Sequence, residues 1–128
     1  MNGREMKLCI ASFSLCLMTI GAAQAAAPTT GDATAGGAVF EDRCAFCHVE
    51  AGDGQGPSLK GLIGRKAASA PGFDFTPALK ASGLTWTADT LDTFLANPGK
   101  AVPGTAMPIR VTDPEQRADL IAYFAKHR

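Results

Sequence analysis

Two thiols and an imidazole lie close together in the segment Cys44-Ala45-Phe46-Cys47-His48. Cysteines three positions apart at the end of a helical turn project their sulfur atoms to one side, where each thiol can add to a porphyrin vinyl group and form a thioether. His48, which follows directly, can then bind the porphyrin iron as an axial ligand. This order of residues is typical of covalent c-type haem attachment. We therefore expect Cys44 and Cys47 to bind one haem c and His48 to bind its iron.

The same segment is a weaker candidate for a disulfide, for a redox-active dithiol or for half of a zinc site. A thioredoxin-like Cys-x-x-Cys accompanies a βαβ pattern, and this sequence has no alternating strand of convincing length. Structural zinc takes four ligands, usually in two spaced pairs. Downstream of the leader described next, the chain has two cysteines and two histidines, so a zinc site would need all four, including His127 in the last turn.

Residues 1–25 have the features of a cleavable secretory signal peptide. A basic start is followed by an uncharged, mostly apolar run over residues 8–20 and by the small-x-small cleavage site Ala23-Gln24-Ala25. The apolar run is shorter than the roughly 20 residues of a membrane-spanning helix, so an uncleaved anchor is the less favoured interpretation. We expect residues 26–128 to form one exported domain in the periplasm.

Cleavage would change the charge balance only slightly. The full chain has 12 Lys and Arg against 12 Asp and Glu, and the leader removes Arg4, Lys7 and Glu5, which leaves ten basic and eleven acidic residues. A net charge near −1 gives no support for nucleic-acid binding or for a polybasic membrane contact.

A domain of this size buries a modest core unaided, and haem would enlarge it. The aromatic residues expected to wall the haem are Phe40, Phe46, Phe73, Phe75, Trp86, Phe94, Tyr123 and Phe124.

A helix at each end of the domain is expected to hold the haem segment in place. Asp32 reads as the N-cap of a helix over residues 33–43, which the haem segment closes. Asp113 and Pro114 begin a C-terminal helix that carries an apolar stripe. Two glycines, Gly36 and Gly37, weaken the first helix but can let another helix approach closely.

Shorter helices and loops are expected between these two helices. Thr76 and Thr87 read as caps of short helices, the first ending near Ala81 and the second before Pro98. Residues 52–70 and 97–112 are rich in Gly or Pro and are predicted as loops. Long irregular stretches are uncommon in compact domains unless they wrap something functional, and a haem would meet that need. The predicted fold class is all-α.

Met107 is the expected second axial ligand. It is the single methionine downstream of the leader, and it lies in Pro103-Gly104-Thr105-Ala106-Met107-Pro108, where flanking prolines fix φ and prevent a helix. A methionine is commonly core filler, but presentation from a stiff loop favours a ligand. His/Met ligation saturates haem iron and raises its reduction potential. His127 is the competing histidine.

With these residues in place, the stretch from Gly31 to Lys126 resembles the soluble class I cytochromes c of the mitochondrial and bacterial short-chain type. Besides the haem segment, the similar runs are Gly56-Pro57-Ser58-Leu59, Gly61-Leu62-Ile63-Gly64-Arg65-Lys66, Ala70-Pro71-Gly72-Phe73, Gly83-Leu84-Thr85-Trp86, Pro103-Gly104-Thr105-Ala106-Met107 and Arg117-Ala118-Asp119-Leu120-Ile121-Ala122-Tyr123.

This resemblance implies a fold and further haem contacts. The first and last helices would cross at right angles, with Gly36 and Phe40 against Leu120 and Tyr123. The carbonyl of Pro57 would accept the second ring N–H of His48 and so fix its tautomer. The residues expected to hold the haem propionates, whose burial needs polar partners, are Arg65, Thr76 and Trp86.

The sequence departs from the mitochondrial type at polar positions near the haem. Phe75 and Phe94 replace tyrosines, and Leu79 replaces an asparagine. A drier pocket disfavours the ferric charge and raises the potential, whereas loss of a hydroxyl beside the Met107 sulfur acts in the opposite direction. The ring of lysines around the haem edge is also depleted, and the non-basic residues at those positions are Ala38, Gly99 and Ala106.

The resemblance implies a periplasmic electron carrier that cycles one haem iron between ferrous and ferric states. Such a carrier is a monomer, is not an enzyme and has no small-molecule substrate. Its donor and acceptor would be redox proteins such as a membrane cytochrome complex, a terminal oxidase or a dehydrogenase. Two alternatives stay open: a peroxidase-like haem enzyme with an open or labile sixth position, and an accessory haem subunit of a periplasmic dehydrogenase.

Overall fold

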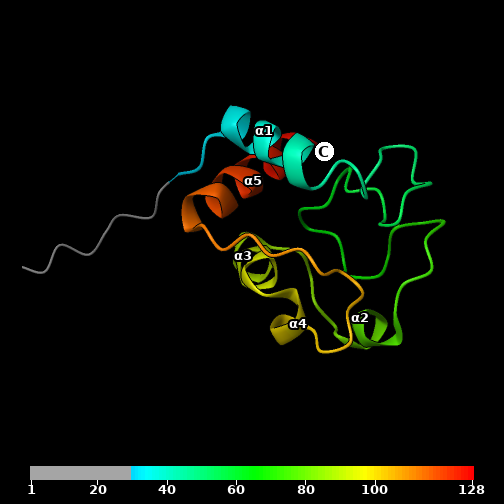
Figure 1. Ribbon diagram of the computed structural model, residues 1–128. Coiled ribbons are helices and arrows are strands. Elements are labelled where there is room, and N and C mark those ends of the chain that lie inside the picture. Colours follow the sequence, from blue (N-terminus) through cyan, green and yellow to red (C-terminus); the bar gives the residue numbers. More distant parts are fainter. Residues whose placement is uncertain (1–29) are drawn as a thin grey trace, which may run out of the picture.

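The computed structural model describes residues 30–128, in which α-helices are joined by long loops (Figure 1). The helices are α1 (Ala33–Arg43), α2 (Pro77–Ala81), α3 (Ala88–Ala96), α4 (Pro98–Ala101) and α5 (Pro114–Lys126). Within the described part, β-type pairing is limited to one isolated bridge between Lys66 and Thr85. The all-α class is therefore confirmed. The predicted leader over residues 1–25 lies outside the described residues.

Helix α1 begins and ends as its sequence predicts. The Asp32 side chain accepts hydrogen bonds from the backbone N–H groups of Thr34 at 2.6 Å and Ala35 at 3.2 Å, as an N-cap does. At the other end, the N–H of Cys44 donates to the carbonyl of Phe40 at 2.8 Å. The last turn of α1 therefore places Cys44 at the start of the loop that follows.

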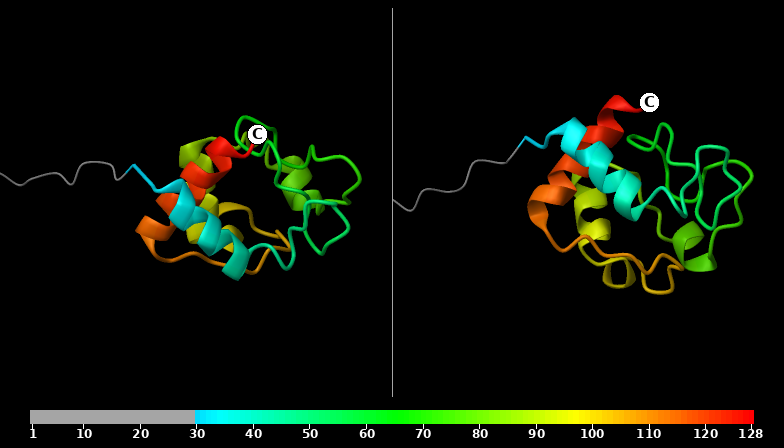
Figure 2. Two further views of the ribbon diagram at one scale, coloured as in Figure 1. Left: turned by 90° about the horizontal axis from the view of Figure 1, so that it is seen from above. Right: turned by 45° about the horizontal axis from the view of Figure 1, so that its top comes forward.

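Helices α1 and α5 lie across each other at one end of the molecule, and the loops around α2 occupy the other end (Figure 2). A Cβ atom added at Gly36 would overlap the carbonyl of Asp119 and approach the Cβ of Tyr123 to 2.9 Å. The Phe40 ring stacks on Tyr123 at a centroid distance of 5.3 Å and meets Phe124 edge-on at 5.9 Å. The expected close contact of the first and last helices through Gly36 and Phe40 is confirmed.

Helix α4 is the element that the sequence pattern did not predict. Asn97 caps it by accepting from the N–H of Lys100 at 3.2 Å, and Pro98 takes its first position. The prediction of loop over residues 97–112 is therefore wrong for its first part. An Asn-Pro pair begins this helix as an Asp-Pro pair begins α5, but four residues are too few to show helical periodicity.

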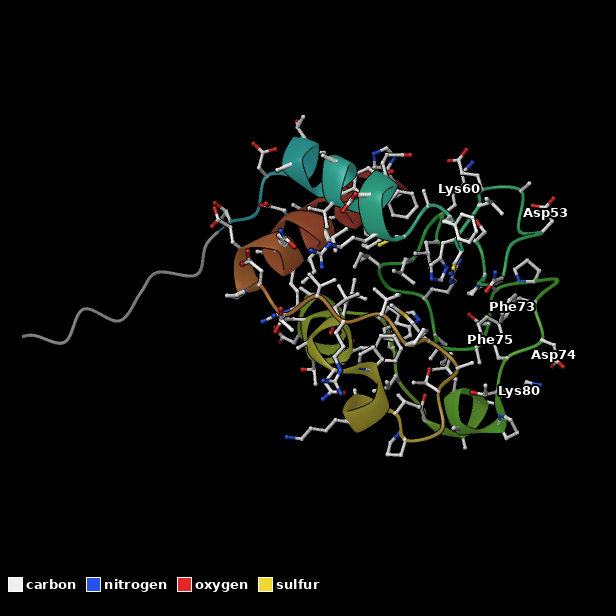
Figure 3. The ribbon with its side chains drawn as sticks, in the orientation of Figure 1. Asp53, Lys60, Phe73, Asp74, Phe75 and Lys80 are labelled. Carbon is white, nitrogen blue, oxygen red and sulfur yellow. The ribbon has the colours of Figure 1, made fainter. Side chains whose placement is uncertain are left out.

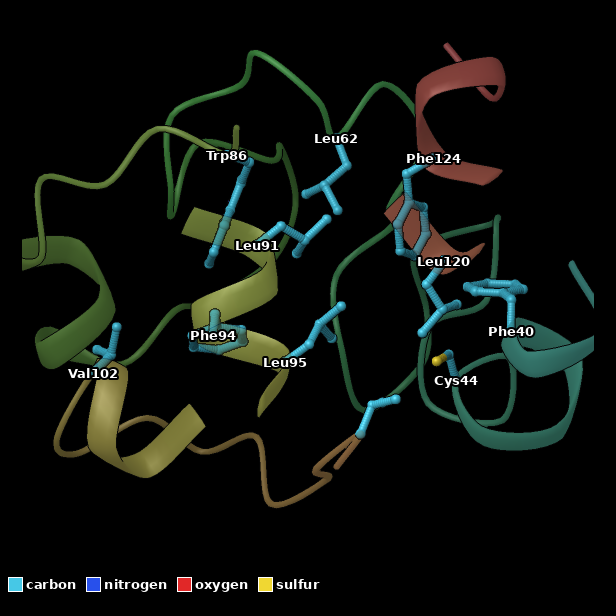
Figure 4. Packing of buried hydrophobic residues seen from close by; sticks show 11 residues of the cluster. Phe40, Cys44, Leu62, Trp86, Leu91, Phe94, Leu95, Val102, Leu120 and Phe124 are labelled. Carbon is cyan, nitrogen blue, oxygen red and sulfur yellow. The ribbon is translucent and has the colours of Figure 1, made fainter. Parts of the chain in front are cut away.

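Most of the buried apolar side chains form one cluster that extends from the α1–α5 contact to α3 (Figure 4). Its members come from α1, α3, α5 and the loops that flank them: Phe40, Cys44, Leu62, Trp86, Leu91, Phe94, Leu95, Val102, Val111, Leu120 and Phe124. None of the helices between residues 30 and 128 combines the length and the apolar character needed to cross a membrane.

Candidate functional site

A cavity of about 300 Å³ lies beside this core, between α3, the loop that follows α1 and the loop that precedes α5. All of the residues predicted to bind haem or its iron line it: Cys44, Cys47, His48, Pro57, Arg65, Thr76, Trp86 and Met107. These residues come from separate segments of the chain, so folding is what brings them together. The volume lies at the lower end of the range of about 300–1,000 Å³ that is usual for small-molecule sites.

The walls of the cavity are largely apolar. Phe75 and Phe94, which replace tyrosines of the mitochondrial type, both line it and are buried, and Leu79 lines it beside them. Phe73 packs edge-on against Phe75 at 4.9 Å. Phe73 and Phe75 point into the loop region, whereas Asp74 between them points outward (Figure 3). An apolar, aromatic wall of this kind fits a flat macrocycle.

The expected role of the aromatic residues is wrong for three of them. Phe40 and Tyr123 pack between α1 and α5 instead of lining the cavity. The Phe46 side chain is 84% exposed. Phe46 stands between two cysteines whose side chains both face the cavity, so its own side chain is directed outward.

Cys44 and Cys47 face the cavity because the chain after α1 continues into one further turn. The N–H groups of Cys47 and His48 both donate to the carbonyl of Cys44, at 3.1 Å and 2.9 Å. Burial raises the pKa of the Cys44 thiol to about 11, and the nearby Arg43 opposes this only in part. Both residues have free sulfur atoms in this fold, as thioether attachment requires.

The imidazole of His48 is held from two sides. Its Nδ1 lies 2.8 Å from the carbonyl oxygen of Pro57, as the resemblance implies. A carbonyl only accepts, so Nδ1 carries the proton and Nε2 keeps the lone pair that binds a metal. Gly56 packs directly on the ring, because a Cβ added there would lie 2.7 Å from Nδ1. The sequence pattern gave Gly56 no role beyond its place in a family-like run.

Met107 lines the cavity from the loop between α4 and α5, and its side chain packs against the core. Its N–H donates to the hydroxyl of Thr105 at 3.4 Å. The competing histidine, His127, lies elsewhere: its ring sits 4.1 Å from that of Tyr123, and its carbonyl accepts from the N–H of Gly61 at 3.2 Å. His127 does not line the cavity.

Arg65, Thr76 and Trp86 supply hydrogen-bond donors along the cavity wall. The guanidinium of Arg65 donates to the carbonyls of Ser58 and Lys60, each at 2.9 Å, and burial lowers its pKa. A guanidinium has five N–H groups, so three of them take no part in these two bonds. The Thr76 oxygen accepts from the N–H of Leu79 at 3.3 Å, so its own O–H stays available. Trp86 packs edge-on against Phe94 at 5.0 Å.

The side chains around the cavity fit a covalent haem better than a metal ion bound by protein alone. No group of three or more His, Cys, Asp and Glu side chains that could hold a metal occurs within residues 30–128. What the cavity does offer is two thiols, one imidazole with a fixed tautomer, one thioether and several N–H and O–H donors. This set matches the needs of a haem iron with two axial ligands.

Known proteins share both the sequence and the shape of this chain. The sequence model of the family described as "Cytochrome c" matches residues 33–127. Cytochrome c of Guizotia abyssinica is 43% identical over 98 residues, which cover 73% of this chain and 88% of that protein. Cytochrome c2 of Rhodomicrobium vannielii is 44% identical over 105 residues, which cover 79% of this chain and 83% of that protein. The solved structure of cytochrome cH from Methylobacterium extorquens superposes with a TM-score of 0.71 at 46% identity, covering 75% of this chain and 99% of that one.

Proposed function

Because this chain belongs to the cytochrome c family, whose members are electron carriers with one covalent c-type haem, we propose that it is a periplasmic one-electron carrier with His48 and Met107 as the axial ligands of the iron. The class I fold of the family is the fold of residues 30–128. One observation carries the finer proposal: His48, with its tautomer set by Pro57, and Met107 line one cavity together with Cys44 and Cys47.

Each residue of the cavity has a distinct task in this proposal. The thiols of Cys44 and Cys47 would form thioethers by addition to two porphyrin vinyl groups and would hold the haem directly after α1. His48 would bind the iron through Nε2 while its Nδ1–H donates to the Pro57 carbonyl, which keeps the ring in one orientation. Arg65, Thr76 and Trp86 offer donors to the haem carboxylates, whose burial without such partners is costly.

When bound, the haem supplies an iron ion that accepts and releases one electron. With both Met107 and His48 as ligands, the iron would have no open position for a substrate, so we propose that the protein is not an enzyme. Its partners are then redox proteins, namely a membrane cytochrome complex, a terminal oxidase or a dehydrogenase. We further propose that residues 1–25 are removed on export and that residues 26–128 act as a monomer.

Replacement of the proposed thioether ligand tests this function. Met107→Leu keeps the size of the side chain but removes the sulfur, so the ferric charge-transfer band should disappear, the reduction potential should fall and carbon monoxide should bind the ferrous protein. The wild type should show the band and bind carbon monoxide poorly. Ile109→Ala is the matched control, because Ile109 lines the same cavity without a ligand atom.

Two results would contradict the proposal. If Met107→Leu leaves the absorption spectra unchanged in both redox states, another group binds the iron. If the wild type itself has a five-coordinate spectrum and binds carbon monoxide readily, the peroxidase-like or accessory-subunit alternative is favoured over the carrier.

A further inference from the structure

The loop that carries Met107 is attached to the rest of the protein mainly at its two ends. At its start, the N–H of Val102 donates to the carbonyl of Pro98 at 2.8 Å. At its end, the N–H of Val111 donates to the carbonyl of Leu95 in α3 at 2.9 Å, and Val111 is 0% exposed. Among the described residues, no backbone–backbone hydrogen bond involves residues 106–110. The position of Met107 therefore depends on where the two ends are held.

One guanidinium holds the second end from α5. Nη1 of Arg117 donates to the carbonyls of Val111 at 3.0 Å and Thr112 at 2.9 Å. Its Nε donates to the carboxylate of Asp92 in α3 at 2.7 Å. The side chain of Arg117 is only 12% exposed, although that of its partner Asp92 is 46% exposed, and all three bonds are charge-assisted. A single side chain thus joins α5, α3 and the end of the loop.

We propose that Arg117 is a positioning residue for Met107 that sets how firmly the thioether holds the sixth position of the haem iron; this rests on the proposed His/Met ligation. Arg117 does not line the cavity, so its effect must pass through the loop. Only residues 108–110 separate Met107 from Val111, and Pro108 has a fixed φ. A shift of Val111 and Thr112 should therefore move Met107 as well, because the short segment between them has little conformational freedom.

Displacement of Met107 by an added ligand measures this property directly. Imidazole must remove the thioether from ferric iron before it can bind, so its affinity reports how firmly Met107 holds. Arg117→Met keeps an apolar chain of similar length but removes all three bonds, and imidazole should bind about 10- to 100-fold more tightly, the range that loss of one charge-assisted hydrogen bond spans. Arg117→Lys keeps the charge without the planar fork and should give a smaller increase.

Two further variants separate positioning from general stability. Asp92→Asn weakens the ion pair with α3 but leaves both bonds to the loop carbonyls, so it should lower the unfolding midpoint with little effect on imidazole affinity. Phe40→Leu weakens the packing of α1 against Tyr123 and Phe124, which lie near the end of α5, whereas Arg117 lies near its start. If Phe40→Leu raises imidazole affinity as much as an Arg117 variant of equal unfolding midpoint, Arg117 is merely structural and the inference is wrong.

A double variant distinguishes failure of the inference from failure of the proposed function. In a Met107→Ala background there is no thioether to displace, so Arg117→Lys should no longer change imidazole affinity. If it still does, the effect does not pass through Met107 and the inference is overturned. If wild type and Met107→Ala bind imidazole equally, His/Met ligation itself is wrong. If the wild type has Met ligation but neither Arg117 variant changes imidazole affinity, only the inference fails.

Discussion

Gly56 illustrates how much a single backbone position contributes to the haem site. The Pro57 carbonyl fixes the Nδ1 side of the His48 ring, and the flat face of the ring rests on the Gly56 backbone. Gly56 also donates its N–H to the carbonyl of Cys47 at 2.9 Å, which ties this loop to the attachment turn. A side chain at Gly56 would therefore force either the ring or the loop to move.

We expect Gly56→Ala to disturb His48, the proposed axial ligand, without preventing haem attachment. The added Cβ would lie 2.7 Å from Nδ1, so the ring must turn or the Pro57 bond must lengthen. Overpacking of this kind typically costs about 1–3 kcal/mol, and the weakened bond should lower the basicity of the imidazole and change the reduction potential. Redox titration and denaturant unfolding of the ferric protein measure the two effects.

Gly99→Ala is the matched control for Gly56→Ala. The nearest atom to a Cβ added at Gly99 is the Asn97 Oδ1, at 3.9 Å, which is ordinary contact. The reduction potential of Gly99→Ala should equal that of the wild type. A Gly56→Ala protein that cannot be distinguished from Gly99→Ala would show that the glycine does not constrain the histidine.

The roles of individual residues differ in how well they can be predicted from the sequence alone. Cys44, Cys47 and His48 can be proposed from the sequence because the attachment chemistry needs them within one turn, and Met107 because its loop cannot form a helix. Arg117 cannot be proposed in this way, because two of its three partners are backbone carbonyls and the third, Asp92, is distant in the chain. The outward direction of Phe46 depends on the turn geometry, which the pattern of residue types does not contain.

The contact between α1 and α5 depends on the absence of a side chain at one position of α1. Gly36 is buried against the backbone of Asp119, whereas a Cβ at the neighbouring Gly37 would meet only the edge of the Tyr123 ring, at 3.3 Å. A ring can shift by a few tenths of an ångström, but the backbone of a packed helix cannot do so cheaply. The two glycines, which look alike in the sequence, therefore have different tasks.

Alanine substitutions at these two glycines should have different effects on stability. Gly36→Ala should lower the free energy of unfolding by about 1–3 kcal/mol or more, because the new Cβ overlaps the Asp119 carbonyl. Gly37→Ala should be close to neutral, because the helix gains about 0.8–1.0 kcal/mol in propensity against a small displacement of the Tyr123 ring. Denaturant unfolding followed by far-UV circular dichroism compares them. Equal effects of the two substitutions would contradict the close approach of α1 and α5.

The start of a helix has a strong signal in the sequence, its capping residue. A helix of one turn has no periodic pattern by which it could be predicted. The caps at Asp32, Thr76, Thr87 and Asp113 all lie where the sequence predicts them. Helix α4 has the same kind of start but ends after one turn, so nothing periodic follows its cap. The paths of the loops that close the cavity are set by tertiary contacts, and only the resemblance to a known family suggested them.

The surface around the cavity has exposed apolar side chains besides the basic residues Arg43, Arg65 and Lys66 that line it. Within the described residues, the large hydrophobic side chains that are exposed are Phe46, at 84%, and Ile109, at 39%. Ile109 lines the cavity, and Phe46 stands between the two cysteines that line it. Both therefore flank the site where electrons would enter and leave. We call Phe46, Ala106, Pro108 and Ile109 the apolar rim.

This rim and the depleted lysine ring predict how the protein meets its redox partners. Charge steering gains about 10- to 1,000-fold in association rate at low salt, but it needs charge concentrated at the contact. Here the resemblance implies that the non-basic Ala38, Gly99 and Ala106 stand at lysine positions of the mitochondrial type, and the net charge would be near −1 if residues 1–25 are removed. Burial of the rim should therefore supply most of the attraction, in a weak and transient complex.

We expect electron transfer to the native partner to depend on Phe46 and only weakly on salt. Raising the ionic strength from 0.01 to 0.15 M shortens the Debye length from about 30 to about 8 Å, and the second-order rate should change little. Phe46→Ser should weaken the complex by about 10-fold or more, because full burial of a Phe side chain contributes about 1.5–3 kcal/mol. Lys80→Ala is the control: Lys80 pairs with Asp74 at 2.9 Å on the outward side of the loops, so its loss should leave the rate unchanged. A steep fall in rate with salt, accompanied by normal rates for Phe46→Ser, would show instead that charges such as Arg43 and Lys100 guide the encounter.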